Sequence, residues 1–251
     1  MNFSVLTIFP GMFDDFASHG IIRRAIESGC LRFGAVDIRD FAEGRHRVTD
    51  DRPYGGGSGM VMKPEPLAAA IKAAKDINPE GKTILMSPQG RRFDQSEAQA
   101  LASFRDIVFV CGRYEGVDER VYENYIDDEL SIGDYVLTGG ELAAMVVMDA
   151  VIRLVPGVLG NENSSASDSF SDGLLEHAHY TRPDVFEGKS VPEVLLSGHH
   201  ENIEDWRTES ALIRTFLKRP DLMLERHFSE QEKQILQKWQ RYLETLIGDN
   251  S

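Results

Sequence analysis

Residues 110–141 hold three glycine-containing turns, and this stretch most limits the folds that the chain can adopt. The turns at 111–116 and 131–135 each follow a short strand-like segment, and the turn at 138–140 leads directly into an apolar helical segment. Glycine lets backbone N–H and C=O groups approach a ligand that a side chain would keep away. Open α/β sheets hold ligands at the ends of neighbouring strands, so the sequence predicts one binding cleft here.

Strand-like and helical segments alternate along the first 160 residues. Strands are predicted at 2–9, 35–39, 83–86 and 107–110, and helices at 21–28, 64–77, 95–104 and 140–154. Asp94 is expected to cap the helix at 95–104, with Glu97 completing a capping box. A further turn is expected at 87–90, where a buried strand ends. The alternation predicts an α/β domain with a mainly parallel sheet.

The sequence changes character at Gly160. Residues 161–171 begin with small polar side chains, which is typical of a linker. Beyond about residue 170 no strand is predicted, and helices are expected at 191–196, 203–217 and 230–247, with Trp206 and Trp239 in their core. The predicted organisation is an α/β domain over 1–160, a linker over 161–171 and an all-helical domain over 172–251.

Composition narrows the function classes. The net charge of −14 argues against unspecific binding to polyanions, although basic residues gathered on one face could still bind RNA. No apolar run is long enough to span a membrane, and the N-terminal residues read as a core strand rather than a signal peptide. Two cysteines, Cys30 and Cys111, are too few for a disulfide framework or a zinc site. A cytoplasmic protein is expected.

The segment at 40–59 is polar and ends in a run of glycines. It can be a solvated loop, as most polar loops are, or a mobile glycine-hinged segment that carries cations to an anionic substrate. The glycines do not fit the dinucleotide-binding pattern GxGxxG, and no GxxxxGK[ST] loop occurs in the chain. Nucleoside triphosphate chemistry is therefore disfavoured.

With these motifs in view, the chain resembles the bacterial tRNA (guanine-N1)-methyltransferase family over nearly its whole length. The segments that carry the resemblance are FPGMF at 9–13, YGGGSGMVMKPEP at 54–66, SPQGRRF at 87–93, CGRYEGVDERV at 111–121, ELSIGDYVLTGGELA at 129–143, RLVPGVLG at 153–160, DSFSDGLLEHAHYTRP at 168–183 and VPEVLLSGHH at 191–200. Their order and spacing are those of the family.

The resemblance implies a SPOUT-type α/β domain with a deep trefoil knot, a homodimer with active sites at the subunit interface, and a helical C-terminal domain that helps to hold tRNA. It also implies S-adenosylmethionine as the methyl donor and N1 of guanosine 37, beside the anticodon, as the acceptor. The residues expected to bind the cofactor lie in the four turns or directly after the third, and are Ser87, Pro88, Gln89, Gly90, Gly112, Tyr114, Glu115, Gly116, Ile132, Gly133, Asp134, Tyr135, Val136, Leu137, Gly139 and Gly140.

Methylation of N1 requires removal of the N1 proton while O6 gains negative charge. A carboxylate within hydrogen-bond reach can take the proton and a cation can stabilise O6. The resemblance gives these roles to Asp168 and Arg153. Without it, Asp168 is a candidate helix cap and Arg153 a cation at a helix end.

The resemblance also places His179, Tyr180 and Arg182 near the RNA, with His177 beside them. Glu115 is a candidate partner for the sulfonium, or for the Mg²⁺ that some members are thought to need. An exposed turn carboxylate is the competing interpretation. Ala166 and Ser167 stand where members often carry acidic residues, so the charge of this linker differs from the family pattern.

Two alternatives remain beside methylation of guanosine 37. One is a related methyltransferase that acts on ribosomal RNA or on a ribose hydroxyl, which would not need Asp168 and Arg153. The other is an RNA-binding or assembly factor that keeps the fold without catalysis. Failure to bind S-adenosylmethionine would favour the latter.

Overall fold

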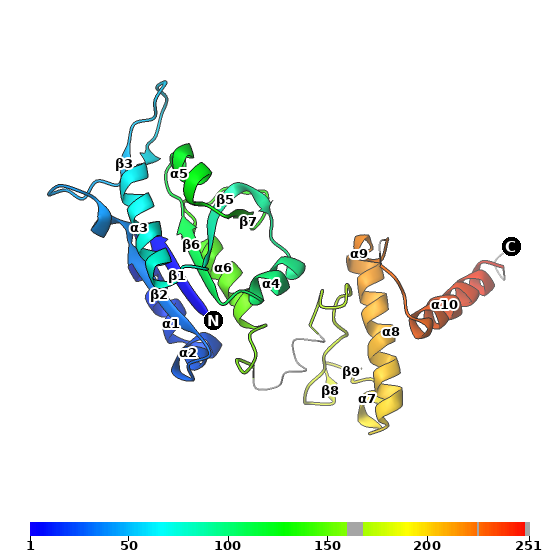
Figure 1. The fold of residues 1–251 in the computed structure, drawn as a ribbon. Coiled ribbons are helices and arrows are strands. Elements are labelled where there is room, and N and C mark those ends of the chain that lie inside the picture. The colour runs from blue at the N-terminus through cyan, green and yellow to red at the C-terminus, as the bar shows by residue number, and fades with distance from the viewer. Residues whose placement is uncertain (160–167, 225, 249–251) are drawn as a thin grey trace. The chain divides into compact units, whose positions relative to one another are not determined.

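The computed structural model describes residues 1–159, 168–224 and 226–248 (Figure 1). Contacts between Cα atoms divide the chain into two compact units, Met1–Glu162 and Asn163–Ser251. Of the predicted linker at 161–171, residues 161–167 lie outside the described residues, and so does Gly160, where the sequence changes character. Each unit is described by itself.

A five-stranded sheet in which every pairing is parallel forms the centre of the first unit. Its strand order is β2-β1-β6-β5-β7, with β1 at Asn2–Thr7, β2 at Arg32–Asp37, β5 at Lys82–Arg92, β6 at Asp106–Cys111 and β7 at Asp128–Ser131. The α/β class and the parallel sheet are therefore confirmed. The strands at 2–9, 35–39 and 107–110 were placed within a few residues of β1, β2 and β6.

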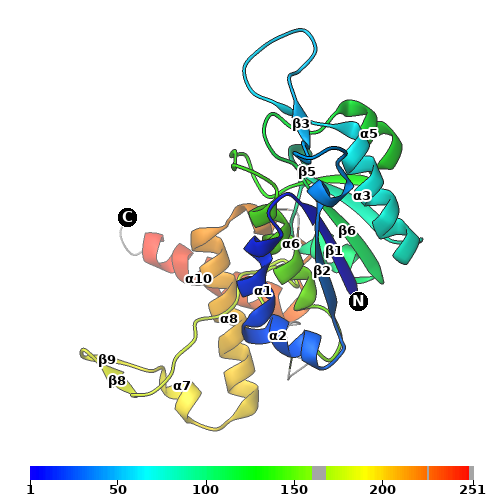
Figure 2. The same cartoon turned by 90° about the vertical axis from the view of Figure 1, so that its left-hand side faces the viewer.

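Helices cover both faces of this sheet (Figures 1 and 2). Helices α2, Gly20–Glu27, α4, Gln95–Ala102, and α6, Glu141–Ile152, pack into one core cluster. Helices α3, Pro64–Ile77, and α5, Glu119–Tyr125, pack with the 3-10 turn η2, Ile38–Phe41, into the other. Side chains of a strand alternate between faces, so β6 sends Phe109 into the first cluster and Val108 and Val110 into the second.

Three short elements complete the first unit. A 3-10 turn η1 at Pro10–Phe13 leads into α1 at Asp14–Ser18, and a two-residue pairing joins β3, Asp50–Asp51, to β4, Val61–Met62. The loops on either side of β3 project from the body of the unit in Figure 1. They contain much of the polar segment at 40–59, which the sequence predicts to be a loop.

The helix predicted at 64–77 has the predicted bounds, and α6 is two residues shorter at its end than predicted. Asp94 caps α4 as expected, since its carboxylate accepts a hydrogen bond from the Glu97 N–H at 2.9 Å. The capping box is incomplete, however, because the Glu97 carboxylate pairs with Arg91. The strand predicted at 83–86 does not end at the turn predicted at 87–90: these residues form an irregular loop within β5, which continues to Arg92. Helix α5 was not predicted.

The second unit is mainly helical. Its long helices are α8, His200–Lys218, and α10, Glu230–Gly248, with the shorter α7 at Glu193–Leu196 and α9 at Asp221–Leu224. The expectation of no strand is wrong in one detail, because β8, Val185–Phe186, and β9, Lys189–Ser190, form a small antiparallel hairpin. Trp206 and Trp239 are only half-buried, whereas Leu212 and Thr215 of α8 are fully buried.

Candidate functional site

A pocket of about 440 Å³ lies at the ends of β6 and β7, beside the middle of β5. Four segments form most of its wall, residues 85–89, 112–117, 129–133 and 135–140, joined by Glu119, Tyr122 and Ala143. The first is the middle of β5, the second follows β6, and the third and fourth run from the end of β7 into α6. The single cleft predicted from the glycine-containing turns is therefore present as a pocket.

All but two of the residues expected to bind the cofactor line this pocket. The lining residues among them are Ser87, Pro88, Gln89, Gly112, Tyr114, Glu115, Gly116, Ile132, Gly133, Tyr135, Val136, Leu137, Gly139 and Gly140. Gly90 and Asp134 are not in its wall. Gly90 instead lies against β7, where an added Cβ would be 2.5 Å from the Leu130 backbone nitrogen.

The segment at 87–90 is looped out of the sheet. Met86 and Arg91 both pair with Leu130 of β7, so the four residues between them have no partners on that strand. Ser87 stabilises the loop by accepting a hydrogen bond at Oγ from the Gln89 N–H at 3.1 Å. Three of the four looped residues reach the pocket wall as a result.

Gly140 ties the segment before α6 to the turn after β6. Its N–H donates to the Gly112 carbonyl at 2.9 Å, and its carbonyl accepts from Ala144 in the first turn of α6. A Cβ on Gly140 would lie 2.8 Å from the Cys111 Cα. Only a residue without a side chain fits this approach of one backbone to another.

A buried ion pair links the same two segments. The Arg113 Nε donates to both Glu141 carboxylate oxygens at 3.1 and 2.9 Å, and Nη1 donates to the Thr138 carbonyl at 3.1 Å. Thr7 Oγ1 donates to the same carboxylate at 2.7 Å. The guanidinium also lies over the Phe9 ring, 4.6 Å from its centroid. The sequence analysis missed this pair, although a glutamate that opens an otherwise apolar helix is a signal for it.

The base of the projecting loops contacts the pocket. Tyr114, in the left-handed region at φ 60°, has a phenol whose pKa is raised by burial and by the nearby Asp50 carboxylate, with which it hydrogen-bonds. The Glu115 N–H donates to the Met60 carbonyl at 3.0 Å. A Cβ on Gly59 would collide with the Glu115 side chain. The polar segment at 40–59 is therefore attached to the pocket at its end.

The two predicted catalytic residues belong to different units. Arg153 is the C-cap of α6, as expected for a cation at a helix end, and is half-buried. Asp168 is half-buried at the start of a turn, in which its carbonyl accepts from the Ser171 N–H at 3.1 Å. No helix begins at Asp168 in the described chain, so the helix-cap interpretation is wrong.

The residues predicted to lie near RNA form an aromatic group in the second unit. The rings of His177 and His179 are 4.6 Å apart, and Trp206 of α8 lies 6.2 Å from His177 and 6.1 Å from Tyr180. His179 and Tyr180 are both exposed. Arg182 is exposed and makes no ion pair with any described residue.

Comparison with known proteins decides the family. A family model described as tRNA (Guanine-1)-methyltransferase TrmD matches residues 1–225. A tRNA (guanine-N(1)-)-methyltransferase of Desulfatibacillum aliphaticivorans is 59% identical over 247 residues, which cover 98% of this chain and 94% of that protein. The chain belongs to this family.

Two further relatives with the same name support the assignment. That of Syntrophotalea carbinolica is 54% identical over 241 residues, covering 96% of this chain and 97% of the relative. That of Anoxybacillus flavithermus is 52% identical over 242 residues, covering 96% and 99%. The predicted family and the predicted enzyme class, a tRNA (guanine-N1)-methyltransferase, are confirmed.

Membership of a methyltransferase family implies S-adenosylmethionine, and the pocket has the chemistry to hold it. Three carboxylates, Glu115, Glu119 and Glu129, line the pocket, while its lining arginine, Arg113, is paired with Glu141. An acidic pocket favours a sulfonium cation over an anion. Apolar side chains such as Leu85, Ile132 and Leu137 offer a surface for the adenine ring.

The carboxylates that line the pocket do not form a metal-binding group with other described side chains. In the described part of the chain, no group of three or more His, Cys, Asp or Glu side chains is arranged to hold an ion. The expectation that Mg²⁺ could be required therefore has no support from these side chains. None of the described helices is long and apolar enough to cross a membrane.

Proposed function

We propose that this enzyme transfers a methyl group from S-adenosylmethionine to N1 of guanosine 37 in tRNA. The observation that carries the proposal is the acidic pocket, which gathers nearly all the turn residues expected to bind the cofactor. The carboxylates provide charge complementarity to the sulfonium, and the close backbone approach at Gly140 keeps the turns at 111–116 and 138–140 together. The proposal places the enzyme in the cytoplasm.

When bound, S-adenosylmethionine supplies an electrophilic methyl group, and the electron pair of the broken C–S bond stays on sulfur. In the proposed reaction, the Asp168 carboxylate accepts the N1 proton, and the electron pair of the broken N1–H bond forms the new bond from N1 to the methyl carbon. The Arg153 guanidinium stabilises the charge that develops on O6. General base catalysis contributes about 10²–10⁴-fold to such a step.

The proposal includes a deep trefoil knot at the cofactor pocket. It is supported by the close crossing of the segments before α6 and after β6, where Arg113 pairs with Gly139 in an isolated antiparallel bridge and Gly140 donates to Gly112. Such backbone approaches are what a threaded chain needs at its crossing. The knot would hold three loops around the adenosine without a separate lid.

The proposed active enzyme is a homodimer. Leu142 and Val146 on α6, each 50% exposed, and Val136, 86% exposed, put apolar surface beside the pocket. Apolar patches on a folded unit commonly mark interfaces between subunits. A partner covering α6 would stand next to the bound cofactor, which fits an active site completed by both chains.

The proposed domain functions divide the same way as the predicted ranges. Residues 1–160 bind the cofactor, 161–171 link the domains and 172–251 contact tRNA. The exposed rings of His179 and Tyr180 can stack on unpaired bases, as aromatic side chains do in single-stranded RNA recognition. Arg182, Lys189 and Lys218 make no ion pairs with described residues and are available for phosphates, whereas Arg207 and Arg219 pair with neighbouring carboxylates.

The test is transfer of labelled methyl from S-adenosylmethionine to unmodified tRNA transcripts that carry guanosine or adenosine at position 37. The expected result is label only on the guanosine transcript, recovered as 1-methylguanosine. Label on neither transcript, with cofactor binding intact, would move the target to another RNA. Absence of both transfer and cofactor binding would favour a non-catalytic RNA-binding role.

A further inference from the structure

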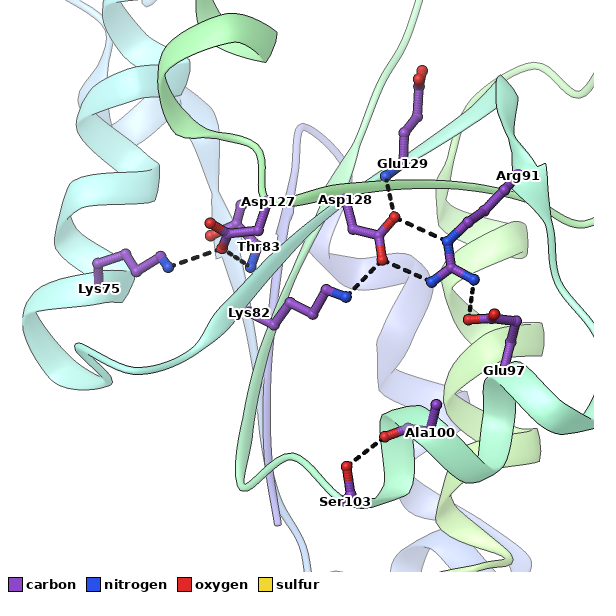
Figure 3. A network of polar contacts seen from close by, with 10 residues as sticks. All are labelled: Lys75, Lys82, Thr83, Arg91, Glu97, Ala100, Ser103, Asp127, Asp128 and Glu129. Carbon is purple, nitrogen blue, oxygen red and sulfur yellow. Dashed lines mark hydrogen bonds and ion pairs between the residues drawn. The ribbon is translucent and has the colours of Figure 1, made fainter.

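A network of charged side chains follows the loop at 87–90 (Figure 3). Arg91, the first residue after the loop, donates from Nε and Nη2 to the two oxygens of Asp128 at 3.1 and 2.8 Å. Its remaining terminal nitrogen pairs with Glu97 of α4. Lys82, at the start of β5, reaches the same Asp128 carboxylate at 2.7 Å.

Asp128 lies close to the point where β5 pairs again with β7 after the loop. Asp128 begins β7, two residues before Leu130, with which both Met86 and Arg91 pair. A strand that leaves a partner and returns to the same residue needs something to fix the point of return, because a shift by one residue would turn every following side chain to the other face. The bidentate Arg91–Asp128 pair holds that point.

The backbone contacts after the loop depend on the same pairing of Arg91 with Leu130 of β7. Arg92 pairs with Ser131, and the Phe93 N–H donates to the Ser131 carbonyl at 2.8 Å. Gly90 approaches β7 so closely that an added Cβ would be 2.5 Å from the Glu129 carbonyl carbon. On the pocket side, Ser87, Pro88 and Gln89 line the cavity together with Glu129 and Ile132.

The network differs from an ordinary surface ion pair, which contributes little. The Asp128 and Glu97 side chains are only 14% and 26% exposed, and the Arg91 side chain, which is 42% exposed, joins these carboxylates of β7 and α4. Planar arginine fits a carboxylate in a fixed geometry that lysine cannot reproduce. The Arg91–Asp128 contact therefore fixes the relative orientation of the two side chains as well as pairing their charges.

We propose that Arg91 is a positioning residue for cofactor binding, because its bidentate contact with Asp128 fixes the conformation of the 87–90 wall of the pocket. The inference rests on the proposed binding of S-adenosylmethionine in this pocket. Arg91 does not line the pocket and acts through the loop that precedes it. Methyl transfer itself, once the cofactor is bound, does not involve this side chain.

The experiment measures the Kd of S-adenosylmethionine by calorimetry without tRNA, and then KM and kcat with tRNA, for the full chain. Arg91→Met and Arg91→Lys are both expected to raise the Kd and the KM about tenfold, with kcat within about twofold of wild type. The lysine variant keeps the charge and loses the planar fork, so a normal Kd for Arg91→Lys would overturn the geometric role.

Two control variants separate positioning from other effects. Arg92→Met removes the adjacent cation, which makes no ion pair among the described residues. Lys75→Met removes a 3.0 Å ion pair between α3 and Asp127, the residue directly before β7. Both are expected to leave the Kd within about twofold of wild type. An equal rise in the Kd for Lys75→Met would assign the effect to general destabilisation and overturn the proposal.

Gly140→Ala separates this inference from the proposed function. If wild type binds the cofactor, Gly140→Ala loses binding and the Arg91 variants bind normally, the positioning role fails and the cofactor pocket stands. If wild type does not bind S-adenosylmethionine, or Gly140→Ala binds it normally, the pocket assignment fails and the inference fails with it.

Discussion

Arg113 and Glu141 form a buried ion pair that spans 28 positions in the chain, with the Glu141 side chain 1% and the Arg113 side chain 15% exposed. Thr7 supplies a third member from the end of β1. Glu141 also stands in the first turn of α6, where a carboxylate is favoured by the helix dipole. The pair thus joins the ends of β1 and β6 to the start of the helix that follows the pocket.

Glu141→Gln is expected to lower the free energy of unfolding by about 3 kcal/mol, because removing one partner of a buried pair leaves the other without compensation. Urea unfolding would measure this loss. The matched control is Glu27→Gln, which removes the exposed Arg23–Glu27 pair at 3.8 Å. That change is expected to cost less than about 0.5 kcal/mol. Equal losses for the two variants would show that the buried pair contributes no more to the free energy of unfolding than the exposed pair does.

Gly140→Ala is expected to weaken S-adenosylmethionine binding at least about tenfold, because the new Cβ would push the turn after β6 out of place. The Cβ would meet backbone, the Cys111 Cα at 2.8 Å, which cannot rotate away. Calorimetry on the full chain measures the affinity. Gly34→Ala is the control, since a Cβ there meets nothing within 4 Å. Normal affinity in Gly140→Ala would contradict the assigned pocket.

The sequence was most informative where structure is local. The proline in the first turn and the apolar periodicity give α3 its bounds, and Asp94 caps α4 through contacts within three residues. The glycine-containing turns of 112–116 and 138–140 could be assigned to one cleft because parallel strands end at the same edge. These parts need no knowledge of distant contacts.

The errors occur where distant segments decide the conformation. Residues 87–90 have turn-forming composition, yet pairing with β7 on both sides turns them into a loop within a strand. The Glu97 carboxylate fits a capping box, yet Arg91 provides a stronger partner. Trp206 was expected in the core of the helical domain, but is half-exposed and lies beside His177 and Tyr180. Such outcomes depend on partners that local pattern does not reveal.

The Asp128 carboxylate is expected to contribute stability that disappears in acid. Arg91 first, and then Lys82, hold the pKa of Asp128 down to about 2, against an ordinary value of about 3.9. A depressed folded pKa stabilises the protein above the unfolded pKa, and this contribution is lost as the pH falls from about 4 to about 2. Because the Arg91 side chain is 42% exposed, solvent screens part of this interaction, and the contribution at neutral pH is about 1–2 kcal/mol.

The check is urea unfolding of wild type and Asp128→Asn between pH 7 and pH 3. The difference in stability is expected to stay constant down to about pH 5 and to shrink below about pH 4. Glu43→Gln, which removes an exposed loop carboxylate, serves as the control and should show little difference throughout. A difference that grows as the pH falls would have the wrong sign for this ion-pair network.

Asp168→Asn is expected to lower kcat by about 10²–10⁴-fold, because the amide cannot accept the N1 proton. The Kd of S-adenosylmethionine should change less than about twofold, since the pocket lies in the first unit. Asp184→Asn, which alters another carboxylate of the second unit, is the control and should keep normal kcat. A strongly weakened cofactor affinity in Asp168→Asn would contradict the assignment of a general base.

Mixing two inactive proteins tests whether one active site draws on both chains. Asp168→Asn keeps the pocket and Gly140→Ala keeps the general base, so a mixed dimer has one complete site only if Asp168 of one chain serves the pocket of the other. Random mixing of equal amounts makes half of the dimers mixed. Methyl transfer should therefore return to about a quarter of the wild-type rate per chain after subunit exchange. Exchange without any return of activity would place both groups within a single chain.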